Sequence, residues 1–213
     1  MNKNFEQQVD EFIELVKNFD KTSIQRGQYI FNPWTDTDSN DGENAPQIRC
    51  SNLKKYMIDN QNADCILIAE SPSKGARYTG IAMTSEGAIK NYKLPYEYSS
   101  ANAKKSPKGE STAFKVWREI TQSNKTFVMW NAFAFNIHTK EDKWFENPVD
   151  EELHANKYIL DAFLKLYPNA QVVAVGATAK KAMDILKIEN VEDIRHPSND
   201  FKKQFPEQIA KYL

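Results

Sequence analysis

Hydrophobic residues along this chain fall into two patterns, short continuous runs and sets spaced like one face of a helix. The continuous runs are typical of strands that are buried on both faces. They predict strands at residues 65–69, 127–130 and 171–176, with a short fourth strand at 190–195. Helices are expected over residues 5–19, 47–60, 111–122, 148–166, 177–186 and 206–213. Ser111 or Thr112 is expected to cap the third of these helices.

The order of these elements determines the fold class that we expect. Strands alternate with helices from residue 63 onward, which predicts a mainly parallel sheet with right-handed crossovers. We therefore expect one α/β domain over residues 1–213, a three-layer α/β/α sandwich with a four-stranded, mainly parallel central sheet. Residues 63–213 would form its core, and residues 1–62 an N-terminal helical and loop decoration. Residues 25–46 are expected to be a long loop, and residues 72–110 to be functional or partly structured.

Composition excludes several classes of protein. With 40% hydrophobic and 12% aromatic residues, a chain of 213 residues can form a sizeable core. No apolar run approaches the ~18 residues of a membrane span, and the acidic N-terminus does not resemble a secretory signal. Cys50 and Cys65 are too few for a disulfide framework, a zinc site or an iron–sulfur cluster. We expect a cytoplasmic monomer without a metal or an organic cofactor.

Charge is distributed unevenly, although the net charge is only −1. Residues 74–108 contain seven basic and two acidic residues. Clustered cations beside a site favour a phosphate-bearing partner more than the charge of the whole chain does. A solvated, lysine-rich loop explains the same pattern equally well.

Polar side chains follow three of the four predicted strands. Glu70 and Ser71 follow the first strand, Asn131 the second, and His196 and Ser198 the fourth. Because the carboxyl ends of parallel strands lie at one edge of a sheet, these residues are expected to share one crevice. A carboxamide offers donors and an acceptor to the edge of a base. A His can stabilise a developing oxyanion, and a Glu can orient or activate water.

Each of these residues also has a structural interpretation. Asn131 is consistent with a residue that only caps a strand end, and His196 with a satisfied turn residue. Glu70 is consistent with a structural ion pair to Arg77. Their joint occurrence at three strand ends favours a functional site over these separate explanations.

With these residues in view, the sequence resembles the uracil-DNA glycosylase superfamily in three blocks that follow the family's order. Residues 69–74 (AESPSK) resemble the first motif, GQDPYH or GEAPG, and residues 79–84 (TGIAMT) stand where the family has GxxF. Residues 128–132 (VMWNA) resemble a strand ending in Asn. Residues 196–198 (HPS) resemble the third motif and are preceded by a strand similar to the family's penultimate one. The resemblance covers about residue 63 to the C-terminus.

The resemblance implies a divergent DNA glycosylase, of the bacterial type without an iron–sulfur cluster, that extrudes a nucleotide and reads the flipped base. Asn131 would pair with the edge of the base, and His196 would stabilise charge on the departing base. The implied catalytic residues are Glu70, Ser71 and His196, and the implied substrate-binding residues are Pro72, Ser73, Met83 and Asn131. The expected DNA contacts are Lys74, Arg77, Ser198 and Phe201.

The sequence departs from the family pattern at four positions. Ser71 stands where many members carry a water-binding Asp or Asn, and Met83 where a Phe stacks on the base. Ser73 stands where a Tyr excludes the methyl group of thymine in the uracil-strict branch. The usual intercalating Leu is missing, so Phe201 is the nearest apolar wedge. Phe201 is equally consistent with a residue that anchors the last helix.

We therefore expect hydrolysis of the N-glycosidic bond of uracil or another deaminated base in DNA, which is a base-excision repair reaction. Two other interpretations stay open. Ser71 and Met83 are consistent with a catalytically weak DNA-binding module of the same fold, and the near-neutral charge with a small-nucleotide-binding protein.

Overall fold

The centre of the molecule is a four-stranded parallel sheet. The computed structural model describes residues 4–73, 75–97, 101–103, 107–138, 147–189, 191–199 and 204–213. The strands are β2 (Cys65–Ala69), β3 (Phe127–Asn131), β5 (Gln171–Val175) and β6 (Glu192–Ile194). Their order is β3–β2–β5–β6, and each neighbouring pair is parallel. The predicted sheet is confirmed, because the runs of apolar residues form strands that helices cover on both faces.

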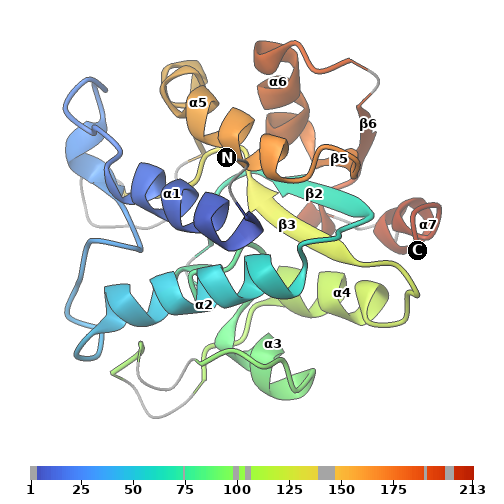
Figure 1. Cartoon of the computed structure of the whole chain (residues 1–213), viewed down its shortest axis with the longest axis horizontal. Coiled ribbons are helices and arrows are strands. Elements are labelled where there is room, and N and C mark those ends of the chain that lie inside the picture. Colours follow the sequence, from blue (N-terminus) through green and yellow to red (C-terminus); the bar gives the residue numbers. More distant parts are fainter. Residues whose placement is uncertain are drawn as a thin grey trace.

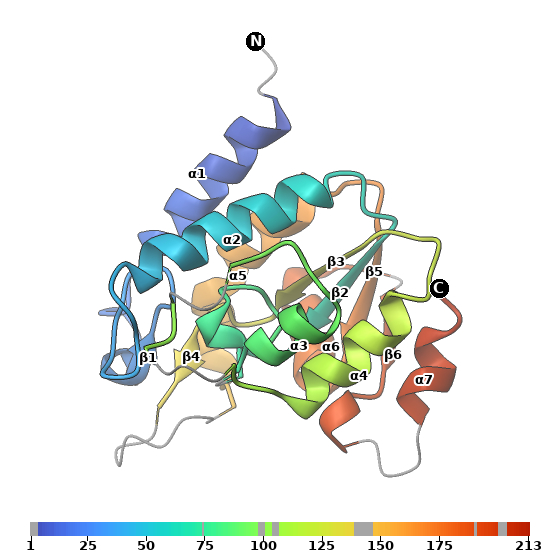
Figure 2. The same cartoon turned by 90° about the horizontal axis from the view of Figure 1, so that it is seen from below.

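Helices form the two outer layers of the sandwich (Figures 1 and 2). The helix α1 packs against α2 and α5, and α5 packs against α6; the shorter α3 and α4 lie together on the other side of the sheet. The bounds are α1 (Phe5–Lys17), α2 (Ala45–Asp59), α3 (Glu86–Asn91), α4 (Ser111–Ile120), α5 (Asp150–Leu166), α6 (Ala177–Leu186) and α7 (Gln204–Ile209). The 3₁₀ turns are η1 (Gly27–Tyr29), η2 (Ala76–Tyr78) and η3 (Pro197–Asn199).

The strand order reverses at β2. From β2 the chain crosses through α4 to β3 on one side, and it then returns through α5 to β5 on the other side of β2. In open sheets of this kind the crevice beyond the carboxyl ends of the strands, at the reversal point, is the usual place for a ligand. The residues that follow β2 and β5 are therefore the first candidates for a ligand-binding site.

The N-terminal segment contributes to the core of the sheet. The ring of Trp130 on β3 stacks on Phe163 of α5, with 5.0 Å between centroids, and Phe12 of α1 meets the same indole edge-on at 5.2 Å. At the outer edge of β3, the hydroxyl of Tyr56 on α2 accepts a hydrogen bond of 2.7 Å from the Met129 N–H. The helix α2 thus satisfies a backbone group that an open strand edge leaves unpaired.

Two expectations about local structure need correction. Residues 25–46 are not only a loop: they contain η1 and the strand β1 (Ile30–Phe31), which pairs antiparallel with β4 (Asn136–Ile137). Residues 72–110, expected to be functional or partly structured, contain the helix α3. Neither Ser111 nor Thr112 caps α4, because the N-cap is Glu110, which makes no capping bond and instead contacts Ser73.

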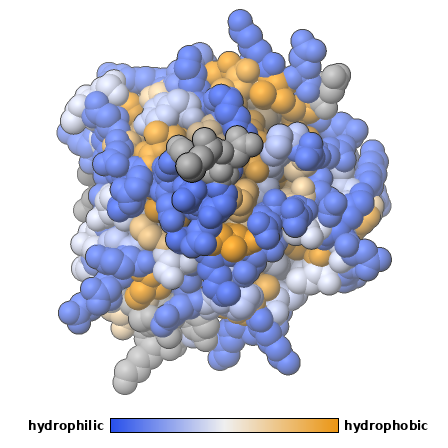
Figure 3. Space-filling model, viewed as in Figure 1, coloured by the Kyte–Doolittle hydropathy of each residue, from blue (hydrophilic) through white to orange (hydrophobic). Residues whose placement is uncertain are grey.

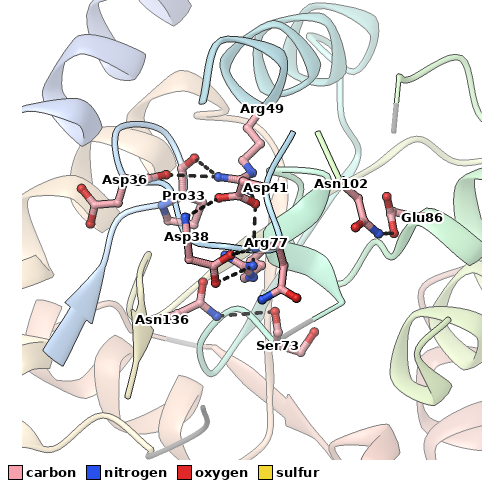
Figure 4. Close-up of polar contacts among 11 residues, drawn as sticks. Pro33, Asp36, Asp38, Asp41, Arg49, Ser73, Arg77, Glu86, Asn102 and Asn136 are labelled. Atoms are coloured by element: carbon pink, nitrogen blue, oxygen red, sulfur yellow. Dashed lines mark hydrogen bonds and ion pairs between the residues drawn. The ribbon is translucent and has the colours of Figure 1, made fainter. Parts of the chain in front are cut away.

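Two buried arginines tie the segment before α2 to the centre of the molecule (Figure 4). Asp41 forms ion pairs with Arg49 of α2 and, at 3.7 Å, with Arg77 of η2; Asp38 lies 2.8 Å from Arg77. Both arginine side chains are fully buried. The guanidinium of Arg77 also lies 4.9 Å from the ring centroid of Phe31 on β1. This cluster of Asp38, Asp41, Arg49 and Arg77, here called the arginine cluster, joins three segments that are distant in sequence.

The surface shows no dominant apolar face in the view of Figure 3. Hydrophilic residues cover most of that view, and apolar groups appear in separate patches. None of the helices within the described ranges is both long and apolar enough to cross a membrane.

The arginine cluster gives a prediction about stability. Asp41→Ala should lower the free energy of unfolding by about 3–5 kcal/mol, because it leaves buried guanidinium charge uncompensated. The matched control is Asp59→Ala, which removes an exposed partner of Lys55 at 3.6 Å and should change stability by less than about 1 kcal/mol. Urea denaturation of both variants measures the difference. Equal stabilities would contradict a supporting role for the cluster.

Candidate active site

A cavity of about 190 Å³ lies beyond the carboxyl ends of the strands. It brings together most of the residues that the sequence singled out, although they come from two separate segments, those that follow β2 and β6. The lining residues are Ala69, Glu70, Ser71, Pro72, Ser73, Met83, Glu110, Thr112, Asn147, His196 and Ser198.

Glu70 is held in place by the helix that follows β5. Its Oε1 accepts a hydrogen bond of 2.6 Å from the hydroxyl of Thr178 in the first turn of α6. The amino-terminal end of a helix favours a negative charge. The alternative of an ion pair with Arg77 is wrong, because Arg77 pairs with Asp38 and Asp41.

His196 approaches the end of β5 closely. A Cβ atom added to Gly176 would lie 3.1 Å from the Cβ of His196, and Gly176 has a φ of +90°. A larger residue at position 176 is therefore disfavoured by both space and backbone conformation. Burial lowers the pKa of His196, and the neighbouring Glu70 partly opposes this shift.

The hydrogen bonds of His196 determine which ring nitrogen carries the proton. The Ser198 N–H donates to Nδ1 at 3.2 Å, and the Ser198 hydroxyl lies 2.7 Å from the same atom. A backbone N–H can only donate, so Nδ1 carries a lone pair and the proton of the neutral ring is on Nε2. Nε2–H is then the donor that His196 offers to a ligand.

The loop after β2 is fixed from two directions. Asn136 of β4 donates from Nδ2 to the carbonyl oxygen of Pro72 and, at 3.4 Å, to that of Ser73 (Figure 4). The Ser73 hydroxyl accepts from the Ala76 N–H at 3.1 Å and donates to Glu110. These bonds hold Pro72 and Ser73 at the cavity wall.

Asn131 does not line this cavity. Its side chain is 3% exposed and lines a second, smaller cavity of about 10 Å³, which has Pro72 as a wall in common with the first. Its Oδ1 has no hydrogen-bond partner in the described part of the chain. The same holds for the Nε1 atoms of two further lining residues, Trp34 and Trp130. This smaller cavity is therefore bordered by residues with polar atoms that have no partner in the described part of the chain.

Met83 lines the open cavity in an uncommon backbone conformation. Its φ is +49°, in the left-handed region that non-glycine residues rarely adopt. The side chain is buried, and it lies at the wall of the cavity as the resemblance implied. Such strain costs roughly 1–3 kcal/mol and is found most often at functional sites.

The expected DNA contacts have different outcomes. Ser198 is exposed and borders the cavity. Arg77 is 1% exposed and belongs to the arginine cluster, so the expectation that it contacts DNA is wrong. Lys74 and Phe201 lie outside the described residues.

The sequence did not point to several residues that shape the site. Glu110, Thr112 and Asn147 line the open cavity, Thr178 holds Glu70, and Asn136 holds the loop after β2. Only Thr178 had a recognisable signal, because it lies two residues beyond Gly176 at the end of a predicted strand. Among the described residues, no group of three or more His, Cys, Asp and Glu side chains is placed to hold a metal ion.

The fold has a solved counterpart. The structure is similar to the crystal structure of wild-type SMUG2 from Pedobacter heparinus, with a TM-score of 0.65 and 14% sequence identity over 96% of this chain and 94% of that chain. SMUG2 is a member of the uracil-DNA glycosylase superfamily. No family model and no curated protein matches the sequence. The likeness shows that the fold is the one that the sequence resemblance implied.

The protonation of His196 can be tested directly. The ring should be neutral at pH 7 with its proton on Nε2, and its pKa should lie below the ordinary value of 6.5 because burial disfavours the charged form. As the pH falls through this range, the folded state should lose stability relative to the unfolded state, whose His titrates normally. Nitrogen-15 NMR of the three His rings measures both properties. A charged ring at pH 7, or a proton on Nδ1, would contradict the assignment.

Proposed function

We propose that the protein is a hydrolase that releases uracil or another deaminated base from DNA by cleaving its N-glycosidic bond. The observation that supports this most directly is the pairing of Glu70 with a neutral His196 in one cavity. The SMUG2-like fold and the three sequence motifs agree with it.

The site offers a group for each charge that forms during base release. As the bond breaks, its electron pair moves onto the base, and the Nε2–H of His196 stabilises the resulting oxyanion. Positive charge develops on the sugar, where the carboxylate of Glu70 stabilises it. Thr178 keeps that carboxylate in place.

Recognition of the base is assigned to Asn131. Its buried Oδ1 has no partner among the described residues, and leaving such a group unpaired costs about 1–3 kcal/mol. A base that supplies a ring N–H removes this cost, which favours the lactam edge of a deaminated base. To contact both Asn131 and His196, the base has to occupy the space on both sides of Pro72. Binding therefore includes a shift of the loop that Asn136 holds.

A cleavage assay tests the function. Purified protein is incubated with single- and double-stranded DNA containing uracil, hypoxanthine, xanthine or mismatched thymine, and abasic sites are detected by alkaline cleavage. Base release from at least one of these substrates is expected. Salt-dependent DNA binding without base release would favour the catalytically weak module. Hydrolysis of free nucleotides alone would favour the small-nucleotide-binding protein.

Variants of Asn131 and His196 should affect different steps. Asn131→Ala should weaken capture of the flipped base and also slow turnover, because recognition precedes and accompanies bond cleavage. His196→Ala should mainly slow turnover, by roughly 10²–10³-fold, since charge on the base appears only as the bond breaks. Single-turnover rates and DNA dissociation constants distinguish these effects, with the exposed His154→Ala as control. If His196→Ala weakened DNA binding as much as it slowed turnover, its assignment would be wrong.

The role of Glu70 has its own prediction. Glu70→Gln should slow turnover while sparing DNA binding, because the amide still accepts a hydrogen bond from Thr178 but carries no negative charge. Glu6→Gln, on the exposed surface of α1, is the matched control. Single-turnover assays and thermal unfolding are run on the same preparations. A wild-type rate, or a loss of stability together with activity, would remove Glu70 from the catalytic residues.

A further inference from the structure

The open cavity contains a second carboxyl group, that of Glu110. This residue is the N-cap of α4, yet its side chain makes no capping bond to the helix. It turns instead toward the loop after β2, where Oε2 accepts from the Ser73 hydroxyl and the carboxyl group accepts from the Ala76 N–H. A Cβ atom added to Gly75 would lie 2.7 Å from Oε2, so the carboxyl group lies directly against this loop.

The carboxyl group of Glu110 keeps acceptor capacity for a ligand. Its contacts among the described residues come from the Ser73 hydroxyl and the Ala76 N–H, whereas an ionised carboxylate has about four lone-pair sites. Glu110 nevertheless lines the cavity together with Glu70 and His196. The site therefore presents a carboxyl group whose orientation is fixed by its bonds to the loop after β2.

The two carboxyl groups occupy different parts of the cavity wall. Glu70 is bonded to the start of α6 and lies close enough to His196 to raise its pKa, against the larger effect of burial. Glu110 is bonded to Ser73 at the other end of the loop that follows β2. A water that attacks the sugar approaches from the side opposite the departing base, and the base is held by His196. The carboxyl group that is not beside His196 is better placed to meet that water.

We propose that Glu110 receives the proton of the attacking water, whereas Glu70 supplies the fixed charge beside His196. This inference rests on the proposed glycosylase function. The C1′–N bond breaks with its electron pair going to the base, which His196 stabilises. The water oxygen forms a bond to C1′, and the proton that it loses passes to the carboxylate of Glu110. The immediate products are the base anion and an abasic sugar with a hydroxyl group at C1′; the base anion then takes up a proton from solvent and Glu110 releases its own to solvent, which restores the carboxylate.

The acid–base properties of Glu110 agree with this role. Burial raises its pKa, and the hydrogen bonds from Ser73 and the Ala76 N–H partly offset the rise. A base whose pKa lies closer to the working pH is a more effective proton acceptor. The other titratable groups that line the cavity with Glu110 are Glu70 and His196, and neither contributes to the shift in the pKa of Glu110.

The test compares the pH dependence of single-turnover cleavage in Glu110→Gln, Glu70→Gln and the control Glu6→Gln. Glutamine at position 110 still accepts from Ser73 and Ala76, so the loop keeps its anchor, but it takes up no proton. In the wild type, the rate should fall about tenfold per pH unit below the pKa of Glu110, since the protonated form is inactive as a base. This fall is the acidic limb of the pH–rate profile. Glu110→Gln should be roughly 10²–10⁴-fold slower at neutral pH and should lose this acidic limb. Glu70→Gln should be slower but should keep it.

Ser73→Ala provides a second, independent readout. The Ser73 hydroxyl lowers the pKa of Glu110, so its removal should raise that pKa and move the acidic limb to higher pH. A purely structural contact would not move it.

Three results would overturn the inference. The first is a Glu110→Gln variant with the rate and acidic limb of the wild type. The second is an acidic limb that disappears in Glu70→Gln and persists in Glu110→Gln. In both cases the wild type still releases bases, so the proposed function survives. The third is a wild type that releases no base from any DNA substrate, which overturns the function and the inference together.

Discussion

The arginine cluster is the constraint on which much of the remaining structure depends. Asp41 lies between Arg49 and Arg77, and these three side chains are almost fully excluded from solvent. Charges in such surroundings are tolerated only when they are paired and hydrogen-bonded. This pairing fixes the segment that carries Trp34, which stacks on Trp130 of β3 at 5.6 Å. It also fixes η2, which begins directly after the loop that forms the cavity wall.

The site therefore consists of one loop that separates two cavities, and packed elements of the fold surround it. The sheet and α6 hold Glu70 and His196 on one side of Pro72, and the stacked indoles and the arginine cluster surround Asn131 on the other side. In the described part of this loop, the contacts from Asn136 and to Glu110 are side-chain hydrogen bonds that join it to neighbouring segments. A bound base that displaces the loop has to break these bonds, whereas the sheet and the arginine cluster stay in place.

The sequence predicted the sheet and the meeting of Glu70 with His196, because buried parallel strands are continuous apolar runs whose ends share one edge. It failed where a role depends on contacts between distant segments. Arg77 has the sequence context of a surface cation, and its burial depends on Asp38 and Asp41 in a segment that had the composition of a loop. Glu110 precedes a helix like any polar residue, and its contact with Ser73 spans 37 residues. No local pattern carries that information.

A physical difference separates the polar residues that support the fold from those that form the site. In the fold, the charge of Arg49 is matched by Asp41 and by the carbonyl oxygens of Pro33 and Asp36, and only its Nε has no partner among the described residues. At the two cavities, polar atoms remain for a ligand: Oδ1 of Asn131 has no partner among the described residues, and His196 is held through Nδ1, which leaves Nε2. His196 is thus oriented through one ring nitrogen and available through the other. Such preorganised donors and acceptors are what stabilise a transition state, because they need not reorient when charge develops.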